Sequence, residues 1–291
     1  MSGKSRVRDT CGVQPLVSVV VPVFNGMPHL PALVDSLFAL DYPNLEFVFS
    51  EGGGSDASSE HLRNLDDPRI RLLSMPRGTS AAENWTAATV AASGEFIKLV
   101  CQDDLLTPAS ISQQVSDLES HPSAVMAIAQ RDIIDARGNL LFARRGLSGV
   151  PRNRTLISGN DMIRTCYEQG TNVLGEPLAV LFRSIPLKES MPWDDSNPLM
   201  LDLSTYEKVA TRGEVVVRHG SVGAFRVSSK SWSTRIAKQQ LEQTRQWQEN
   251  YRKTCGGQLP WPSHVRARLG RHVHTQLRRL AYATLRLKGN L

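Results

Sequence analysis

The sequence predicts an α/β protein in which helices flank a mostly parallel sheet and a helical extension follows. Short apolar runs alternate with amphipathic segments from Leu16 to about Val100, an alternation typical of a parallel sheet. The first run, Val17 to Val23, is β-branched and apolar on both faces, as a central parallel strand covered by helices must be. With 291 residues, 41% of them hydrophobic, the chain can bury one large core.

Each element of the first half has its own signal. Apolar residues spaced three and four apart predict a helix that ends at Tyr42-Pro43. This helix would bury Leu30, Leu33, Val34, Leu37 and Phe38 on one face. Further strands are predicted over 45–49, 70–73 and 96–100. The alanine-rich segment 79–92 predicts a helix, with Gly94 as its C-terminal capping residue.

The second half gives a more mixed pattern. Its predicted elements are a helix over 108–119, a hairpin over 124–143 that turns at 136–139, a helix over 159–169, an apolar run over 178–182, a helix over 202–211, a strand over 215–217, and helices over 234–252 and 264–287. Ser158 is placed to cap the predicted helix over 159–169, with Asp161 three residues later.

Three polar clusters follow predicted strands: Asn25, the loop from Glu51 to Asp56, and Gln102-Asp103-Asp104. Ligands of open α/β sheets bind beyond the carboxyl ends of strands, so we expect a ligand there. Adjacent carboxylates repel unless a cation lies between them, and Mg²⁺ favours one or two carboxylates plus phosphate oxygens. The alternatives are local: Asp104 caps a helix or the aspartates are solvated, and the glycine loop is an ordinary turn capped by Ser55 or Asp56.

Several of these segments together resemble one family. They are Val17-Ser-Val-Val-Val-Pro-Val-Phe-Asn25, the Gly/Ser/Asp loop, Ala82-Glu-Asn-Trp85, and Lys98-Leu-Val-Cys-Gln-Asp-Asp104 followed by Pro108. In order and spacing they resemble family 2 glycosyltransferases over residues 15 to 230. The resemblance implies a GT-A fold of Rossmann-like type and inverting sugar transfer from a nucleotide diphosphate-sugar donor to an acceptor hydroxyl. Processive relatives carry membrane-spanning helices and a Gln-x-x-Arg-Trp motif. This sequence has no apolar run long enough for a span, and Gln243-Thr-Arg-Gln-Trp247 has the wrong spacing, so transfer of a single sugar is expected.

The resemblance also implies which residues form the donor site. Pro22, Phe24, Asn25 and Glu51 would contact the nucleoside, Arg77 a phosphate or the base, and Asp103 and Asp104 a Mg²⁺ or Mn²⁺ ion, with Asp104 the more direct ligand. Two positions depart from the family pattern, since Glu51 and Cys101 stand where aspartates are usual. The first departure affects base or ribose contacts, and the second leaves the metal motif with its last two members.

In the second half the resemblance implies a catalytic base and a basic residue near the diphosphate. The base would be Asp202, which opens the segment before Arg212-Gly213; the alternatives are that Asp202 caps its own helix, or that Asp194 or Asp195 is the base. The basic residue would be Arg226, unless it is a surface cation beside a strand.

The net charge of +6 belongs to the C-terminal tail. Residues 261–291 hold seven Arg or Lys and no acid, whereas the first 260 hold 27 basic against 28 acidic residues. On a helical wheel one sector holds Val265, Leu269, Val273, Leu277, Leu280 and Leu287, and the opposite side is rich in arginine. Such a helix either lies on an anionic membrane surface or packs its apolar stripe on the domain. No aromatic platform accompanies the charge, so nucleic acid is not an expected partner.

Three parts are therefore expected: a flexible N-terminus (1–14), a GT-A domain (15–230) with a nucleotide-binding half (15–104) and an acceptor half (105–230), and a basic helical extension (231–291). Scattered cysteines and the lack of a long apolar run favour the cytoplasm, with the inner membrane face as a peripheral location. The expected acceptor is a glycan or lipid-linked molecule of cell-envelope or polysaccharide synthesis. Two alternatives are an inactive nucleotide-sugar-binding module and a nucleotidyltransferase, although the latter normally has a basic glycine-rich loop where Pro-Val-Phe-Asn-Gly stands.

Overall fold

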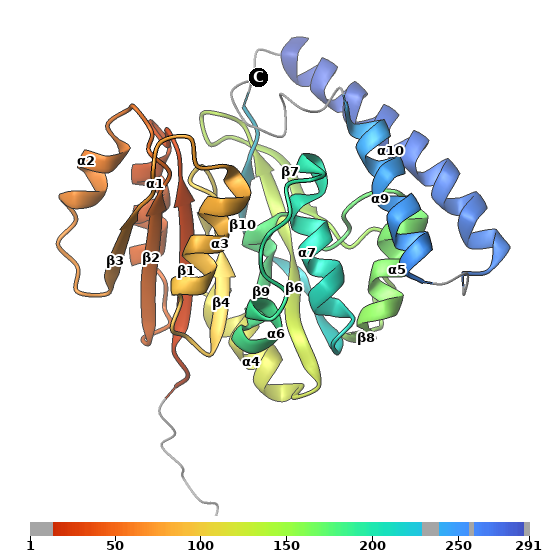
Figure 1. The fold of residues 1–291 in the computed structure, drawn as a ribbon, viewed down its shortest axis with the longest axis horizontal. Helices are drawn as coiled ribbons and strands as arrows, with labels where there is room; N and C mark the ends of the chain where they lie inside the picture. Colours follow the sequence, from red (N-terminus) through yellow and green to blue (C-terminus); the bar gives the residue numbers. More distant parts are fainter. Residues whose placement is uncertain (1–13, 229–238, 256–258, 288–291) are drawn as a thin grey trace, which may run out of the picture.

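The computed structural model describes residues 14–228, 239–255 and 259–287. Within these ranges the strands form one ten-stranded sheet with helices on both faces (Figure 1). Most of the predicted flexible N-terminus and the predicted helical stretch at 234–238 lie outside the described residues.

The first half of the sheet is parallel, as predicted. The strands are β1 (Val17–Val23), β2 (Leu45–Glu51), β3 (Ile70–Ser74) and β4 (Phe96–Leu99), in the order β3-β2-β1-β4. In the register of this sheet Val23 at the end of β1 pairs with Glu51 at the end of β2. The loops that follow these two strands therefore begin side by side, at the carboxyl edge.

The second half of the sheet is mixed. Its strands are β5 (Leu105–Leu106), β6 (Ala124–Ile134), β7 (Leu140–Arg145), β8 (Leu156–Ser158), β9 (Val180–Arg183) and β10 (Glu214–Arg226). β9 is antiparallel to both β4 and β6, whereas β10 is parallel to β6. The predicted hairpin of β6 and β7 is confirmed. The prediction for β10 was too short, because the strand continues through polar residues with shifts of register at Arg218 and Ser221.

Helices cover both faces of this sheet. They are α1 (Leu30–Phe38), α2 (Ser58–Arg63), α3 (Ala81–Ala91), α4 (Ser110–Ser120), α5 (Gly159–Gln169), α6 (Ser184–Lys188), α7 (Leu201–Ala210), α9 (Gln240–Thr254) and α10 (Trp261–Leu287), with 3₁₀ turns η1 (Pro177–Ala179) and η2 (Pro198–Met200). Ser158 caps α5 as predicted, since its hydroxyl accepts a hydrogen bond from the Asp161 N–H over 3.2 Å. Ser80 and Glu83 cap α3 reciprocally.

The role predicted for Gly94 was wrong. Helix α3 ends in an extended residue, Ala92, so no left-handed glycine cap is used. Gly94 is needed for a different reason, because a Cβ there would lie 2.7 Å from the Leu16 carbonyl oxygen and from the Ser18 amide nitrogen. The glycine lets this turn pass close beside the start of β1.

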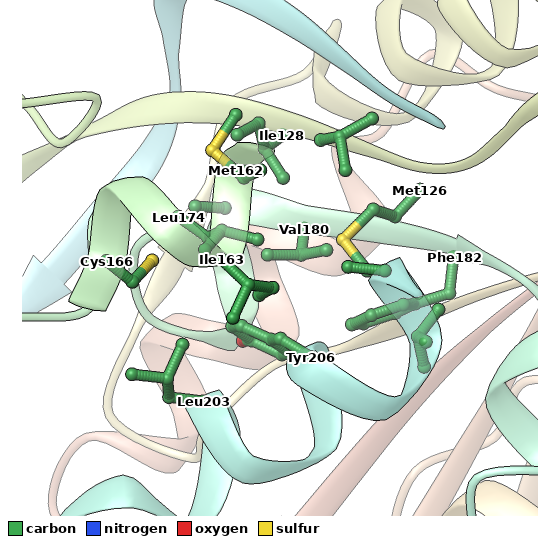
Figure 2. Packing of buried hydrophobic residues seen from close by; sticks show 14 of the residues in the cluster. Met126, Ile128, Met162, Ile163, Cys166, Leu174, Val180, Phe182, Leu203 and Tyr206 are labelled. Carbon is green, nitrogen blue, oxygen red and sulfur yellow. The ribbon is translucent and has the colours of Figure 1, made fainter. Parts of the chain in front are cut away.

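The core lies in two layers, one on each face of the sheet. On one face the odd-numbered valines of β1 pack with α1 and α4, and on the other Val20 joins the cluster that includes α3, α5 and α7. Figure 2 shows this second layer, where Ile163 of α5 lies close to Tyr206 of α7 and Met162 of α5 lies beside Ile128 of β6. Because Asp202 lies beside Leu203 at the start of α7, this packing fixes where its carboxylate enters the site.

Helix α10 forms the outermost layer, against α5 and α9 (Figure 1). It approaches α5 closely at Gly270, where a Cβ would lie 2.4 Å from the Glu168 carbonyl oxygen. Its inward residues include Ser263, Ala267, Thr275 and Leu285. The apolar stripe read from the sequence is not what packs on the domain: Val265, Leu269, Val273, Leu277 and Leu280 are exposed. The alternative in which the apolar stripe packs on the domain is therefore wrong, because the inward residues, most of them small, make the contact between α10 and the domain.

Candidate functional site

The loops after β1 and β2 are joined by side-chain hydrogen bonds. The Asn25 Oδ1 accepts from the Ser55 N–H over 2.7 Å, and Asp56 accepts from the Met27 N–H over 2.9 Å. Asp56 also accepts from the Ser58 N–H at the start of α2. The N-cap position of α2 is Ala57, so neither Ser55 nor Asp56 is the N-cap that the alternative required. Asn25 has φ 51°, a left-handed conformation that asparagine tolerates. The Asn25 amide therefore shapes the glycine loop.

Glu51 and the glycines form the floor of this loop. The Glu51 side chain is buried and accepts from the Gly54 N–H over 2.8 Å. Gly53 has φ 73°, and a Cβ there would lie 2.8 Å from the Arg77 Cα. The backbone at Arg77 thus lies against the glycine loop, and the Arg77 side chain is exposed. Pro22 is buried within β1, opposite Ser50.

Two amide side chains, for which the sequence predicted no individual role, hold these loops in place. The Gln102 amide accepts from the Phe24 N–H over 2.6 Å and donates to the Phe24 carbonyl over 2.8 Å. Buried Asn84 accepts from the Ser50 hydroxyl and donates to the Val23 carbonyl. Gln102 thereby ties the loop after β4 to the loop after β1, and leaves the Phe24 ring 54% exposed.

The aspartate pair is split between a cavity and the protein interior. Asp103 lines a cavity of about 810 Å³, whereas Asp104 is fully buried. The Asp104 Oδ1 accepts from the Arg226 N–H over 3.1 Å, and its buried Oδ2 has no hydrogen-bond partner among the described residues. Burial, and then the charge of Asp103, raise the pKa of Asp104 well above its usual value. Such an unpaired acceptor is costly unless a proton or a cation offsets it.

Arg226 is not the surface cation of the alternative reading, because it is only 4% exposed. Its Nε donates to the Asp103 carbonyl over 2.9 Å, and its Nη1 donates to the Asp135 and Ala136 carbonyls. The backbone N–H of Arg226 also donates to Asp104, so Arg226 contacts both residues of the aspartate pair and holds them in position. Contact of Arg226 with a diphosphate stays a prediction.

The cavity joins Asp103 to the second half of the chain. Its lining includes Trp85 and Cys101 beside Asp103, the β6–β7 hairpin with Arg131, Phe142, Arg144 and Arg145, the loop with Asn172 and Glu176, Asp202 at the start of α7, and one face of α10. A concave site with apolar walls and a few charged groups suits a small-molecule substrate. Asp194 and Asp195, the competing candidates for the base, are not among its lining residues.

Asp202 faces this cavity with fixed hydrogen bonds. Its Oδ2 accepts from the Asn172 Nδ2 over 2.8 Å, and its Oδ1 accepts from the Leu203 N–H over 2.7 Å. Asp202 does not cap α7, since the N-cap position is Met200. Burial raises the pKa of Asp202 to about 7, although both hydrogen bonds oppose the rise. The carboxylate can therefore take up a proton near neutral pH.

A second cavity carboxylate has the opposite electrostatic setting. Glu176 forms an ion pair with Arg131, which is largely buried. Burial alone would raise the pKa of Glu176, but Arg131 holds it below its usual value. Neither residue stood out in the sequence, because no local motif links a hairpin arginine to a glutamate far along the chain. Of the two carboxylates, Asp202 is therefore the one with base-like properties.

The family model described as glycosyl transferase family 2 matches residues 18–177, which extend from the second residue of β1 to the first residue of η1 and include both loops described above. The chain belongs to glycosyl transferase family 2. A relative from Sinorhizobium fredii, uncharacterized protein y4gI, is 32% identical over 124 residues, which are 41% of this chain and 14% of that protein. An uncharacterized glycosyltransferase of Rickettsia felis is 28% identical over 153 residues, 52% of this chain and 25% of the relative. The chain thus matches a quarter or less of the length of these two relatives.

Solved structures confirm the GT-A fold for this family 2 chain. TarS of S. aureus in complex with UDP-GlcNAc matches with a TM-score of 0.57 at 16% identity, over 78% of this chain and 66% of that one. The mannosyltransferase PcManGT of Pyrobaculum calidifontis, in complex with GDP-Man and Mn²⁺, matches with a TM-score of 0.62 at 17% identity, over 96% and 77%. The predicted family and α/β fold are therefore confirmed.

Proposed function

We propose that this chain transfers a single sugar from a nucleotide diphosphate-sugar donor to an acceptor hydroxyl, with inversion at the anomeric carbon. One observation carries the proposal: the same cavity is lined by Asp103, at the carboxyl end of the donor-side sheet, and by Asp202, at the start of α7. The donor class is supported by TarS and PcManGT, whose structures hold UDP-GlcNAc and GDP-Man. In this proposal residues 15–104 bind the nucleotide and residues 105–230 the acceptor.

The proposed nucleoside site lies at the ends of β1 and β2. The exposed Phe24 ring offers a surface on which a base can stack. Glu51 and Asn25 shape the glycine loop, whose lack of side chains lets a ribose or phosphate approach the backbone. Pro22 would support this floor, and exposed Arg77 would reach a phosphate or the base.

The aspartate pair fits a divalent cation such as Mg²⁺ or Mn²⁺. No group of three or more His, Cys, Asp or Glu side chains among the described residues is arranged to hold a metal ion. A bound ion would therefore also need phosphate oxygens of the nucleotide diphosphate-sugar as ligands. The unpaired, buried Asp104 Oδ2 fits a nearby positive charge, and Asp103 faces the cavity. We propose that Asp103 and Asp104 hold the ion, which when bound offsets negative charge on the diphosphate. Arg226 keeps both aspartates in place.

Asp202 is the proposed general base. Its carboxylate takes the proton of the acceptor hydroxyl as that oxygen forms a bond to the anomeric carbon. On the opposite face, the bond from the anomeric carbon to the diphosphate oxygen breaks, and the diphosphate leaves with the electron pair. Attack opposite the leaving group inverts the anomeric centre. Asn172 orients the Asp202 carboxylate for this transfer.

The proposed acceptor is a glycan or lipid-linked molecule, used at the cytoplasmic side in cell-envelope or polysaccharide synthesis. Support comes from the walls of the cavity, where apolar Phe142 and Leu277 stand beside cationic Arg144 and Arg278. An acceptor with both apolar and anionic groups matches this lining. Within the described residues no helix is long and apolar enough to cross a bilayer.

The Asp202→Asn variant tests this function, with exposed Asp195→Asn as the matched control. Release of nucleoside diphosphate from the donor, with water as the substitute acceptor, would be measured together with donor affinity. We expect Asp202→Asn to lower turnover by about 10²- to 10⁴-fold, the usual contribution of a general base, and to keep its donor affinity. Equal, measurable turnover in Asp202→Asn and wild type would contradict the assignment of the base. Donor binding without turnover in either protein would favour an inactive binding module.

A further inference from the structure

The outer face of α10 carries a stripe of large apolar side chains that nothing covers within the described part of the chain. Val265, Leu269, Val273, Leu277 and Leu280 are 37, 61, 53, 56 and 64% exposed, and we call them the α10 stripe. Lone exposed apolar residues need no explanation, but a contiguous row of them marks an interaction surface.

The stripe does not serve to hold α10 on the domain. That contact is made by the opposite side of the helix, where Ala267 and Leu285 are buried and Gly270 lets α10 approach α5 closely. Most of the stripe therefore faces away from the domain, and Leu277 lies at its edge, where it also lines the cavity. The occupant of the stripe must come from outside the described chain.

The positive charge around the stripe favours an anionic lipid surface over a second copy of this chain as the binding partner. Residues 261–291 contain seven Arg or Lys and no acid. Arg268 and Arg279 are exposed on α10, and Arg266 pairs with Glu168 of α5. A second copy that packed stripe against stripe would bring two such cationic helices together without a carboxylate of either helix between them. An anionic lipid surface offers both an apolar interior for the stripe and negative charge for the arginines.

We propose that α10 docks this chain on an anionic membrane surface, with the α10 stripe in the boundary between headgroups and acyl chains. The consequence for the acceptor rests on the proposed function. Leu277 belongs both to the stripe and to the wall of the cavity that holds Asp202, and His274, Arg278 and Ala281 line the same wall. In Figure 1 the C-terminal end of α10 reaches the carboxyl edge of the sheet. Docking would thus place the cavity beside the membrane, where a lipid-linked acceptor could enter.

Co-sedimentation of the full chain with vesicles tests the docking itself. Vesicles of phosphatidylcholine alone would be compared with vesicles containing one quarter phosphatidylglycerol, at low and high salt. We expect binding to the anionic vesicles that weakens with salt. The double variant Leu269→Glu/Val273→Glu should lose at least about tenfold in vesicle affinity, because it places charge in the apolar layer. Arg268→Glu/Arg279→Glu should lose affinity and show a weaker salt dependence.

The matched control is Ile185→Glu, which changes a 71% exposed apolar residue on α6 and should bind vesicles as wild type does. Absence of binding to anionic vesicles, or equal binding by Leu269→Glu/Val273→Glu, would overturn the proposal. If light scattering showed a dimer for wild type and a monomer for this double variant, the stripe would be assigned to contact with a second copy instead. Donor titration of the same variants separates the two claims, since a docking failure leaves donor affinity intact and a donor-site failure does not touch vesicle binding.

Discussion

The Asn172 side-chain amide donates a hydrogen bond to the Asp202 carboxylate over 2.8 Å, and both residues line the cavity. The Asn172 oxygen accepts in turn from the Leu174 N–H over 3.0 Å, so the amide cannot turn away without losing that bond. Burial raises the pKa of Asp202 to about 7, and the Asn172 bond limits the rise. Asn172 is therefore a positioning residue that also sets when the proposed base is charged.

The pH profile of turnover should report this pair. A base must be ionised, so the rate should increase with pH through an apparent pKa near 7. Removal of the Asn172 amide in Asn172→Ala withdraws a bond that favours the carboxylate, and the profile should move to higher pH. Turnover between pH 5 and 9 is the measurement, with exposed Asn250→Ala as control. An unchanged midpoint in Asn172→Ala would contradict the assigned role.

Glu207 should make the protein less stable as the pH rises. Burial raises the pKa of Glu207 to about 7, even though the Trp247 Nε1 donates to its carboxylate over 3.0 Å. The raised pKa means that the folded state keeps a proton which the unfolded state releases above about 4.5. Its contribution to stability is therefore full below that pH and is lost as the pH rises through about 7.

Urea unfolding at pH 5 and pH 8 tests the Glu207 prediction. The Glu207→Gln variant cannot ionise, so its free energy of unfolding should fall less between these pH values than that of wild type. Exposed Glu119→Gln should follow wild type. Parallel curves for Glu207→Gln and wild type would show that Glu207 does not titrate in this range.

The glycine loop can be probed with two matched glycines. Gly53 and Gly78 both have positive φ, 73° and 88°, so alanine is strained at either position. Only at Gly53 would the added Cβ meet another atom closely, the Arg77 Cα at 2.8 Å. Gly53→Ala should therefore cost more stability than Gly78→Ala and should weaken donor binding. Equal thermal shifts for the two variants would show that the loop at Arg77 moves freely.

Gln102 should matter for donor affinity without touching the donor. Its amide makes two hydrogen bonds to the Phe24 backbone, which hold the exposed ring at the end of β1. Each such bond is worth about 1 kcal/mol, so Gln102→Ala should weaken donor binding about 5- to 30-fold. Calorimetric titration measures this, with exposed Gln113→Ala as control. Unchanged donor affinity in Gln102→Ala would mean that the position of the Phe24 ring does not depend on these two hydrogen bonds.

The donor half of the fold was predictable because its signals are local. The β-branched run of β1 and the spaced apolar face of α1 each fit within one element. The polar clusters around Asn25, Glu51 and Asp103 lie immediately after the ends of strands in the sequence. The structure places them at the same edge of the sheet, as parallel strands require.

The hairpin of β6 and β7 and helix α5 were predictable in the acceptor half, but its long-range pairings were not. The length of β10 depends on its pairing with β6, which lies far away in the sequence. The Arg131–Glu176 ion pair and the Asn172–Asp202 bond likewise join distant loops. The orientation of α10 was missed because its contact with α5 uses Gly270 and other small residues, which carry little weight in an apolar pattern.

The most direct test of the donor site is calorimetric titration of the purified chain with a panel of nucleotide diphosphates and nucleotide sugars. Each would be tested with Mn²⁺ and with chelator, on wild type, Asp103→Asn and exposed Asp41→Asn. We expect micromolar binding of one donor, lost at least about tenfold with chelator or in Asp103→Asn and kept in Asp41→Asn. No binding by the folded protein, or equal binding by Asp103→Asn, would contradict the proposed site.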